Sequence, residues 1–88
     1  MKRILVTAIG GDISQSIAQC LRNNDNDVFL IGTDIHDKHG GSLFVDQFHT
    51  VPSAKSPDYL QTISDFVKQE NINVIIPVNE NEIKLLTN

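Results

Sequence analysis

The N-terminal segment constrains the fold more than any other part of this sequence. An unbroken apolar run, Ile4 to Val6, leads through Gly10 and Gly11 directly into a helical pattern. A continuous apolar run is typical of a parallel strand that is covered on both faces. Adjacent glycines allow a tight turn, because glycine adopts backbone angles that a residue with a Cβ resists. We therefore predict a strand, a turn and a helix, with a ligand crevice beside the turn.

The first helix has both a start signal and an apolar face. Asp12 is a good N-cap, and Gln15, three residues later, resembles the partner of a capping box. Apolar residues then recur at helical spacing, which predicts one buried face. This face consists of Ile13, Ile17 and Leu21, with Ala18 and Cys20 beside them.

Three further apolar segments, residues 28–31, 47–51 and 73–77, predict three more strands. A strand, a helix and a strand within about 30 residues form a parallel βαβ unit. We therefore predict one small Rossmann-like α/β domain of three layers spanning residues 1–88. Its sheet has about four parallel strands in the order 3-2-1-4, with the first strand in the interior. Residues 35–46 are expected to form a loop on the ligand side.

Two later helices also have start signals. Ser56 is predicted as an N-cap with Pro57 in the first helical position, where a missing N–H costs nothing. Asn79 and Glu82 have the N-cap spacing again and open a last helix. The second helix is expected to bury Leu60, Ile63 and Val67, flanked by Tyr59 and Phe66. The last helix is still short when the sequence ends, so we expect the parent protein to be longer.

Composition excludes several classes of protein. Of the 88 residues, 40% are hydrophobic, which is compatible with a folded core. The net charge is −4 and the seven Lys and Arg residues are scattered, whereas a nucleic-acid binder usually carries a basic stripe. No apolar run approaches the roughly 20 residues that cross a bilayer, and no signal peptide is visible. With Cys20 as the single cysteine, we expect a cytoplasmic protein that binds neither nucleic acid nor membrane.

The Gly10–Gly11 turn is the first candidate binding site, because free N–H groups at a helix N-terminus attract anions. The dinucleotide fingerprint requires the pattern Gly-x-Gly-x-x-Gly. Its three positions correspond here to Ala8, Gly10 and Ile13, so only the middle one fits. Asp12 also places a carboxylate where a pyrophosphate would lie. The turn is therefore interpreted as a tight connection in preference to a dinucleotide site.

Asp34 ends the second predicted strand. In a dinucleotide domain, an acid at this position would hold the ribose hydroxyls. Without the full glycine pattern, the favoured interpretation is that Asp34 caps the strand or binds the adjacent loop. An acid that faces a crevice could still contact a polar ligand.

No metal site or nucleophile is predicted. His36 and His39 have a three-residue spacing that would suit a metal only on a helix, and this segment is predicted as a loop. His49 is interpreted as structural. Cys20 has no basic neighbour that would lower its pKa. Glu80, like Glu82, is best placed as a favourable charge in a first helical turn.

Four segments together resemble the N-terminal pre-ATP-grasp domain of ATP-grasp ligases. They are residues 4–11, 31–35, 46–52 and 73–77, in this order and spacing. The most specific part is Asp-x-Phe-x-x-Val-Pro at 46–52, followed by Ser-Pro-Asp-Tyr and a helix. The branch that this sequence most resembles is similar to the large subunit of carbamoyl-phosphate synthase, and the similarity covers nearly the whole chain.

This resemblance implies a part in ATP-dependent ligation, in which a carboxylate is activated as an acyl phosphate and attacked by an amine or another nucleophile. ATP and Mg²⁺ would bind to later domains of the same protein. This segment would therefore bind no cofactor or metal, hold no catalytic residue and be inactive alone. It would close one side of the cleft and help to bind a small-molecule carboxylate or amine, with Gly10, Gly11, Asp34 and Glu82 lining the cleft. The family usually has glycine at the positions of Ala8 and Ser14, and this departure puts contact between the turn and substrate in question.

Three functions remain under consideration. The main hypothesis is the substrate-side N-terminal domain of an ATP-grasp ligase. The second is a fragment of an NAD(P)-dependent epimerase or reductase, for which the strand–glycine–helix start and Asp34 are the support. The third is a free-standing regulatory or interaction module. A homodimer is compatible with each of them.

Overall fold

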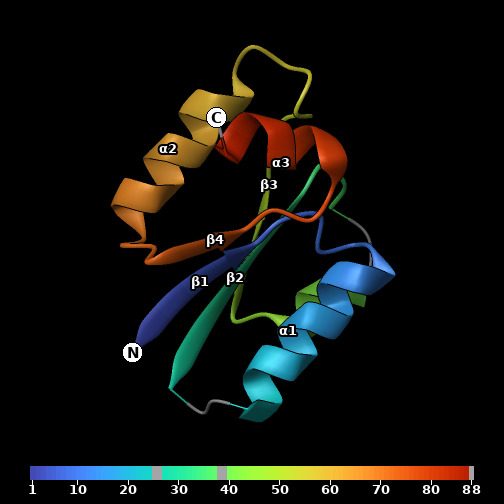
Figure 1. Cartoon of the computed structure of the whole chain (residues 1–88), viewed down its shortest axis with the longest axis vertical. Helices are drawn as coiled ribbons and strands as arrows, with labels where there is room; N and C mark the ends of the chain where they lie inside the picture. Colours follow the sequence, from blue (N-terminus) through green and yellow to red (C-terminus); the bar gives the residue numbers. More distant parts are fainter. Residues whose placement is uncertain (25–26, 38–39, 88) are drawn as a thin grey trace.

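The computed structural model describes residues 1–24, 27–37 and 40–87, and within them strands and helices alternate along the chain (Figure 1). The strands are β1 (Lys2–Val6), β2 (Val28–Asp34), β3 (Gln47–Thr50) and β4 (Val74–Ile76). The helices are α1 (Asp12–Asn24), α2 (Tyr59–Gln69) and α3 (Glu80–Thr87), with a 3₁₀ helix η1 (Gly40–Phe44) before β3. The predicted order of elements is confirmed. No helix in this described part is both long and apolar enough to cross a membrane.

All described strand pairs are parallel, and the strand order is β3-β2-β1-β4. Leu5 in β1 lies between Ile31 of β2 and Ile75 of β4, and Gly32 pairs with Phe48 of β3. The predicted order 3-2-1-4, with the first strand in the interior, is therefore confirmed. Because the strands are parallel, the segments that follow them meet at one edge of the sheet.

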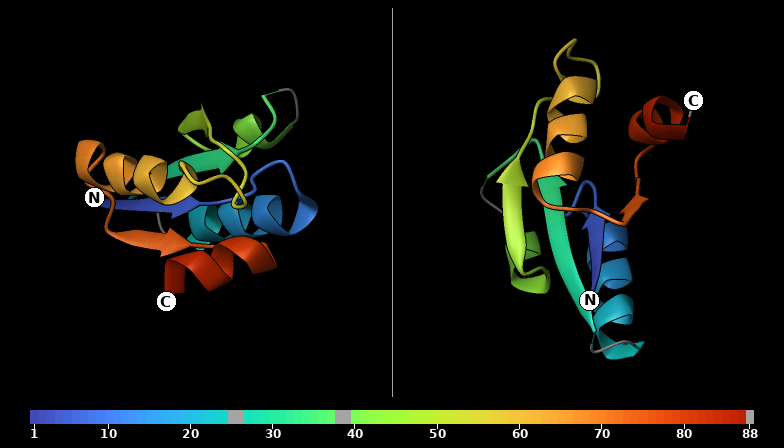
Figure 2. Two further views of the ribbon diagram at one scale, coloured as in Figure 1. Left: turned by 90° about the horizontal axis from the view of Figure 1, so that it is seen from above. Right: turned by 90° about the vertical axis from the view of Figure 1, so that its left-hand side faces the viewer.

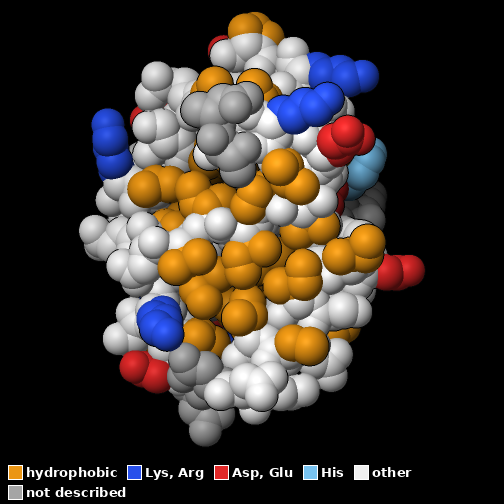
Figure 3. Space-filling view, viewed as in Figure 1, with side chains coloured by type: hydrophobic (Ala, Val, Ile, Leu, Met, Phe, Trp, Pro, Cys, Tyr) orange, Lys and Arg blue, Asp and Glu red, His pale blue; other side chains and the backbone are white. Residues whose placement is uncertain are grey.

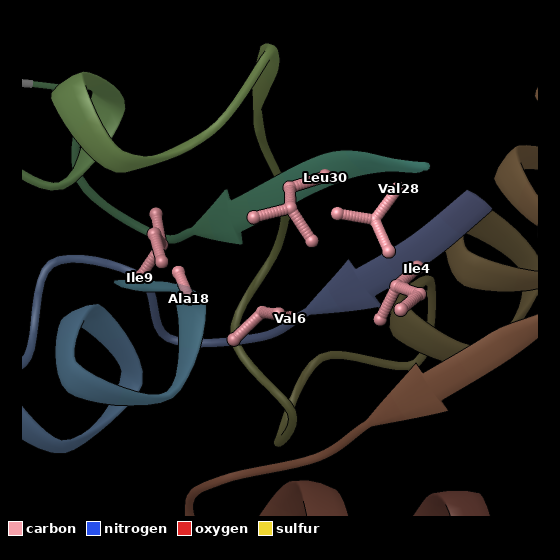
Figure 4. Close-up of a cluster of buried hydrophobic side chains, with 6 residues drawn as sticks. All are labelled: Ile4, Val6, Ile9, Ala18, Val28 and Leu30. Atoms are coloured by element: carbon pink, nitrogen blue, oxygen red, sulfur yellow. The ribbon is translucent and has the colours of Figure 1, made fainter. Parts of the chain in front are cut away.

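Helices cover both faces of the sheet, which gives the predicted three layers (Figure 2). Successive side chains of a strand point to opposite faces, so β1 and β2 contribute to two separate cores. The core on the α1 side, shown in Figure 4, consists of Ile4, Val6, Ile9, Ala18, Val28 and Leu30. The core on the α2 side consists of Leu5, Ile31, Val51, Tyr59 and Ile63, and Leu85 and Leu86 of α3 pack against it.

The buried stripe of α1 differs from the predicted one. Ser14 and Ala18 face the sheet, whereas Ile13 is 69% exposed and Cys20 is also exposed. The Ser14 hydroxyl donates a 2.8 Å hydrogen bond to the carbonyl of Thr7, which draws residue 14 toward the end of β1. The predicted burial of Ile13 is therefore wrong, because Ser14, a small polar residue with a satisfied hydroxyl, takes the inward position.

The start of α1 also differs from the predicted capping box. Asp12 is the first residue of the helix and not its N-cap. The side-chain amide of Gln15 donates to the carbonyls of Ile9 and Gly10, at 3.2 Å each, and so binds the turn that precedes the helix. The Gly11 carbonyl accepts the backbone N–H of Gln15 at 3.1 Å. These hydrogen bonds therefore join the glycine turn to the first turn of α1.

Helix α2 begins at Tyr59, two residues after Pro57, which was predicted to open it. The Ser56 hydroxyl accepts a 3.2 Å hydrogen bond from the N–H of Asp58, so it binds a backbone N–H just before the helix. Tyr59 takes the buried position that was predicted for Leu60, which is 48% exposed. The large aromatic side chain thus faces the sheet at the first turn of α2.

The predicted loop between β2 and β3 contains η1. Phe44 and the adjacent Val45 pack against the α1-side core, whereas Leu43 is 86% exposed. His39 of the predicted histidine pair lies outside the described residues.

Candidate functional site

A cavity of about 220 Å³ lies beyond the carboxyl ends of the strands, and we call it the strand-end pocket. Its wall is built from the segments that follow each of the four strands, together with the start of α2. In parallel sheets, ligands bind at this edge. The polar part of the lining consists of Asp34, Ser53, Tyr59, Asn79, Asn81 and Glu82.

The carboxylate of Asp34 holds the glycine turn in place. Its Oδ2 accepts a 2.8 Å hydrogen bond from the N–H of Gly10, and its Oδ1 accepts a 3.0 Å bond from the N–H of His36. A further hydrogen bond of 3.0 Å joins the N–H of Ile9 to the carbonyl of Thr33, the neighbour of Asp34. Asp34 therefore binds the adjacent loops, as the favoured interpretation of the sequence proposed, while it also lines the pocket.

The unusual backbone geometry of this turn lies at Ala8 and not at the glycines. Ala8 has a φ of 52°, in the left-handed region, whereas no positive φ is found at a glycine within the described part of the chain. The Ala8 carbonyl accepts a 3.0 Å hydrogen bond from the N–H of Gly11, which closes the turn. The expectation that Gly10 and Gly11 adopt glycine-specific angles is therefore wrong. The strain falls on Ala8, a residue with a Cβ.

Glycine is required at position 32 of β2 because another side chain lies close to its backbone. The Ile9 side chain, buried in the α1-side core, lies so near that a Cβ on Gly32 would meet its atoms at 3.0 Å. Ile9 therefore anchors the turn against β2. The turn that precedes α1 is thus fixed by packing from one side and by Asp34 from the other.

A buried carboxylate joins α2 to α3 across the pocket wall. Glu82 is only 5% exposed, and its Oε2 accepts a hydrogen bond from the hydroxyl of Tyr59. Its Oε1 accepts a 2.7 Å bond from the side-chain amide of Asn79, whose own oxygen accepts the N–H of Glu82 at 2.8 Å. These bonds confirm Asn79 as the N-cap of α3 and offset the cost of burying a carboxylate.

The acid–base character of this cluster follows from its burial. Desolvation raises the pKa of the Tyr59 hydroxyl far above its ordinary value of 10.0, and the hydrogen bond to Glu82 and its charge raise it further. Tyr59 is therefore a permanent hydrogen-bond donor near neutral pH. It cannot serve as a phenolate base there.

The electrostatic character of the strand-end pocket is acidic. Asp34 and Glu82 both line it, and the described lining contains no Lys, Arg or His. Its charged side chains are therefore both acidic, and its amide and hydroxyl groups can donate as well as accept hydrogen bonds. Such a lining suits a group that carries N–H donors or a positive charge, and it does not suit a phosphate.

The sequence-predicted residues come together only in part. Asp34 and Glu82 line the same pocket. Gly10 meets Asp34 through its N–H, and Gly11 lines a neighbouring depression at the start of α1. Tyr59 was predicted only as a flanking core residue, and no local signal pairs it with Glu82, because the two are 23 positions apart.

The other chemical candidates stay apart. Among the described residues, no three His, Cys, Asp or Glu side chains are grouped so that they could hold a metal ion. His36 is exposed, and His49 lies 4.6 Å from Phe66, centroid to centroid, on the α2 side of the sheet. Asp12 is exposed in the first turn of α1, where its charge favours the positive end of the helix dipole.

Comparison with known proteins decides the family. A family model described as PylC-like, N-terminal domain, matches residues 4–88. The chain belongs to this family. PylC-like N-terminal domains are pre-ATP-grasp domains of ATP-grasp ligases, so the resemblance to that group is confirmed at this level. A closer relationship to the large subunit of carbamoyl-phosphate synthase is not established by the match. A search of curated proteins finds no match.

Within this PylC-like N-terminal domain, the match runs from β1 to the end of α3 and so includes every segment of the strand-end pocket. Neither the glycine turn nor the Tyr59–Glu82 contact lies outside the matched residues. The pocket therefore lies within the matched domain.

Proposed function

We propose that this chain is the substrate-side domain of an ATP-dependent carboxylate ligase, related in its arrangement to the large subunit of carbamoyl-phosphate synthase, and that it has no activity alone. The family match supports a place in an ATP-grasp ligase. The composition of the strand-end pocket supports the substrate side, because its described lining offers no cation for phosphate oxygens. Because the described lining offers no cation for phosphate oxygens, we propose that ATP, with its Mg²⁺, binds to another part of the ligase.

The observation that carries the substrate proposal is the pair of carboxylates in one pocket. The Asp34 and Glu82 carboxylates are held at the wall of the cavity by backbone and side-chain donors. A cationic amine would gain charge-assisted hydrogen bonds there. We propose that the pocket receives the amine end of the small molecule that is joined to the activated carboxylate.

Binding of a simple amine tests this proposal. Titration of the ¹⁵N-labelled chain with n-butylammonium is expected to shift the backbone amides of Asp34, Tyr59, Asn79 and Glu82, whereas acetate leaves them in place. Glu82→Gln, which removes the charge but keeps the shape, is expected to abolish the amine-induced shifts. Equal shifts with acetate would contradict an amine site.

A second pair of variants leaves the hydrogen-bonded residues Tyr59, Asn79 and Glu82 unchanged. Asn81 is exposed at the rim, so Asn81→Lys adds a positive charge to the pocket without disturbing the core. We expect it to abolish the amine-induced shifts, while Gln61→Lys on the exposed surface of α2 leaves them unchanged. Retention of the shifts in Asn81→Lys would place the amine elsewhere.

The competing dinucleotide hypothesis is tested in parallel. Asp34 already binds two backbone N–H groups, and the turn lacks the glycine pattern, so neither feature favours a ribose and pyrophosphate site. Saturation by NADH or NADPH below about 1 mM would favour an epimerase or reductase instead.

The ligase proposal also predicts no phosphate release when the chain alone is mixed with ATP and Mg²⁺. An ATP-grasp module in the reading frame after residue 88 would support it, and a different module would contradict it.

A further inference from the structure

An apolar groove runs along the side of α1 that faces away from η1. Its volume is about 610 Å³, and it is larger than the strand-end pocket. In Figure 3 it lies within the hydrophobic patch at the centre of the face, between α1 and β4. The apolar residues that line it are Ile4, Ile13, Ile17, Cys20, Leu21 and Val28.

The exposure of this face follows from where the helices pack. Helix α2 and the apolar side chains of α3 pack on the opposite face of the sheet. On the face that carries the groove, α1 is the helix that covers β1. Next to the groove, β4 pairs only with β1 in the described sheet, and Val74 is 45% exposed. Ile13 is 69% exposed at one end of the groove. An exposed apolar groove of this kind is a candidate interaction site.

The two ends of the groove carry opposite charges. Lys2 lines the end where β1 begins, and Asp12 lines the end where α1 begins. Because α1 runs back along β1, these two ends are far apart along the groove (Figure 1). Neither Lys2 nor Asp12 forms an ion pair within the described residues.

We propose that the occupant of this groove is a second copy of the chain. An isologous contact requires one patch that is complementary to itself after a two-fold rotation. A two-fold axis across the middle of the groove, near Ile17, exchanges its ends and brings Lys2 of each copy to Asp12 of the other. The same rotation carries the projecting Ile13 toward the half of the partner's groove that Cys20 lines.

The charge of the chain disfavours other occupants. A membrane surface rich in anionic lipid, or a nucleic acid, requires a cluster of basic residues. The groove has Lys2 as its basic lining residue, and the net charge of the chain is −4. The self-complementary pair of charges is therefore better matched by a second copy. This inference does not depend on the proposed ligase function.

Equilibrium sedimentation of the full chain tests the dimer. We expect a monomer–dimer equilibrium within reach of about 100 µM protein, and Ile13→Asp should weaken the dimer by about tenfold or more. Ile13 is exposed, so this change leaves the fold intact. Leu43→Asp, at an 86% exposed residue of η1 outside the groove, is the matched control and should leave the dimer unchanged. A monomer at all concentrations would overturn the proposal, and so would equal effects of the two variants.

A charge swap tests the orientation of the two copies. Lys2→Glu and Asp12→Lys should each weaken the dimer, because each places like charges opposite one another. The double variant Lys2→Glu/Asp12→Lys should restore it, since the pairs are re-formed with reversed polarity. Failure of the double variant to recover would overturn the two-fold arrangement, whatever the outcome of the amine titration.

Discussion

The hydroxyl of Tyr59, in the first turn of α2, donates a hydrogen bond to the buried carboxylate of Glu82 in α3. This contact joins two helices through residues that are 23 positions apart in the sequence. It also fixes one wall of the strand-end pocket, because both residues line it. The shape of the candidate site therefore depends on a tertiary contact between a phenol and a carboxylate.

Removal of the Tyr59 hydroxyl should destabilise the fold. Tyr59→Phe leaves the Glu82 carboxylate buried without one of its donors, and a lost partner of a buried charged acceptor costs about 1–3 kcal/mol. Thr62→Ala is the control, because Thr62 is a partly buried residue of the same helix and its hydroxyl binds only a helical carbonyl. We expect the control to change the free energy of unfolding by less than about 0.5 kcal/mol. Urea unfolding followed by circular dichroism measures both, and equal effects would show that the contact contributes little.

Ala8→Gly should stabilise the glycine turn. The left-handed φ of 52° costs alanine about 1–2 kcal/mol, whereas glycine adopts it freely. The greater entropy of glycine in the unfolded chain offsets part of this gain, so we expect a net increase of about 0.5 kcal/mol in the free energy of unfolding. Ala18→Gly, in the middle of α1, should instead lower it by about 1 kcal/mol or more. A thermal shift of the same sign in both variants would contradict the assignment of strain to Ala8.

Two buried threonines, Thr7 just after β1 and Thr33 in β2, should respond to valine in opposite ways. The Thr33 hydroxyl is buried and has no hydrogen-bond partner among the described residues, so Thr33→Val is expected to be neutral or to stabilise by about 1 kcal/mol. The Thr7 hydroxyl accepts a 3.0 Å hydrogen bond from the N–H of Val78. Thr7→Val leaves that N–H unpaired and should cost about 1–2 kcal/mol. Denaturant unfolding of the two variants compares them directly, and equal losses would indicate that Thr33 has an unrecognised partner.

Asp46 should make stability depend on pH on the acid side. Burial alone would raise its pKa, but the hydrogen bonds from Arg22, at 2.7 Å, and from the N–H of Leu30, at 2.8 Å, lower the pKa below its ordinary value of 3.8. A carboxylate with a lowered folded-state pKa stabilises the fold above its unfolded-state pKa, and this stabilisation disappears as the pH falls through the folded-state pKa.

The variant Asp46→Asn isolates this contribution. We expect it to be less stable than the original chain by about 1 kcal/mol near pH 7, and the difference should shrink as the pH falls from about 5 to below about 3. Asp37→Asn, at an exposed position, should show no such dependence. A difference between Asp46→Asn and the original chain that stays constant with pH would contradict the role of the Asp46 charge.

The sequence predicted the architecture because the signals for it are local. The apolar runs of β1 and β2 mark strands that are covered on both faces, and the intervening helix has the matching period. The strand order followed from the parallel topology. The Asn79–Glu82 spacing likewise predicted the start of α3, since an N-cap binds N–H groups of its own helix.

The details of the candidate site were decided by contacts between distant residues. Ser14 faces the sheet because it finds the Thr7 carbonyl, and this turns Ile13 outward against the apolar pattern. Ala8 takes the left-handed conformation because Asp34 and Ile9 fix the turn around it. The sequence alone determines the features that depend on residues within one helix or strand, such as apolar periodicity and N-cap spacing. Which polar groups meet when the elements pack, and which apolar faces stay uncovered, depends on the tertiary structure, because those partners are brought together only by the folded sheet.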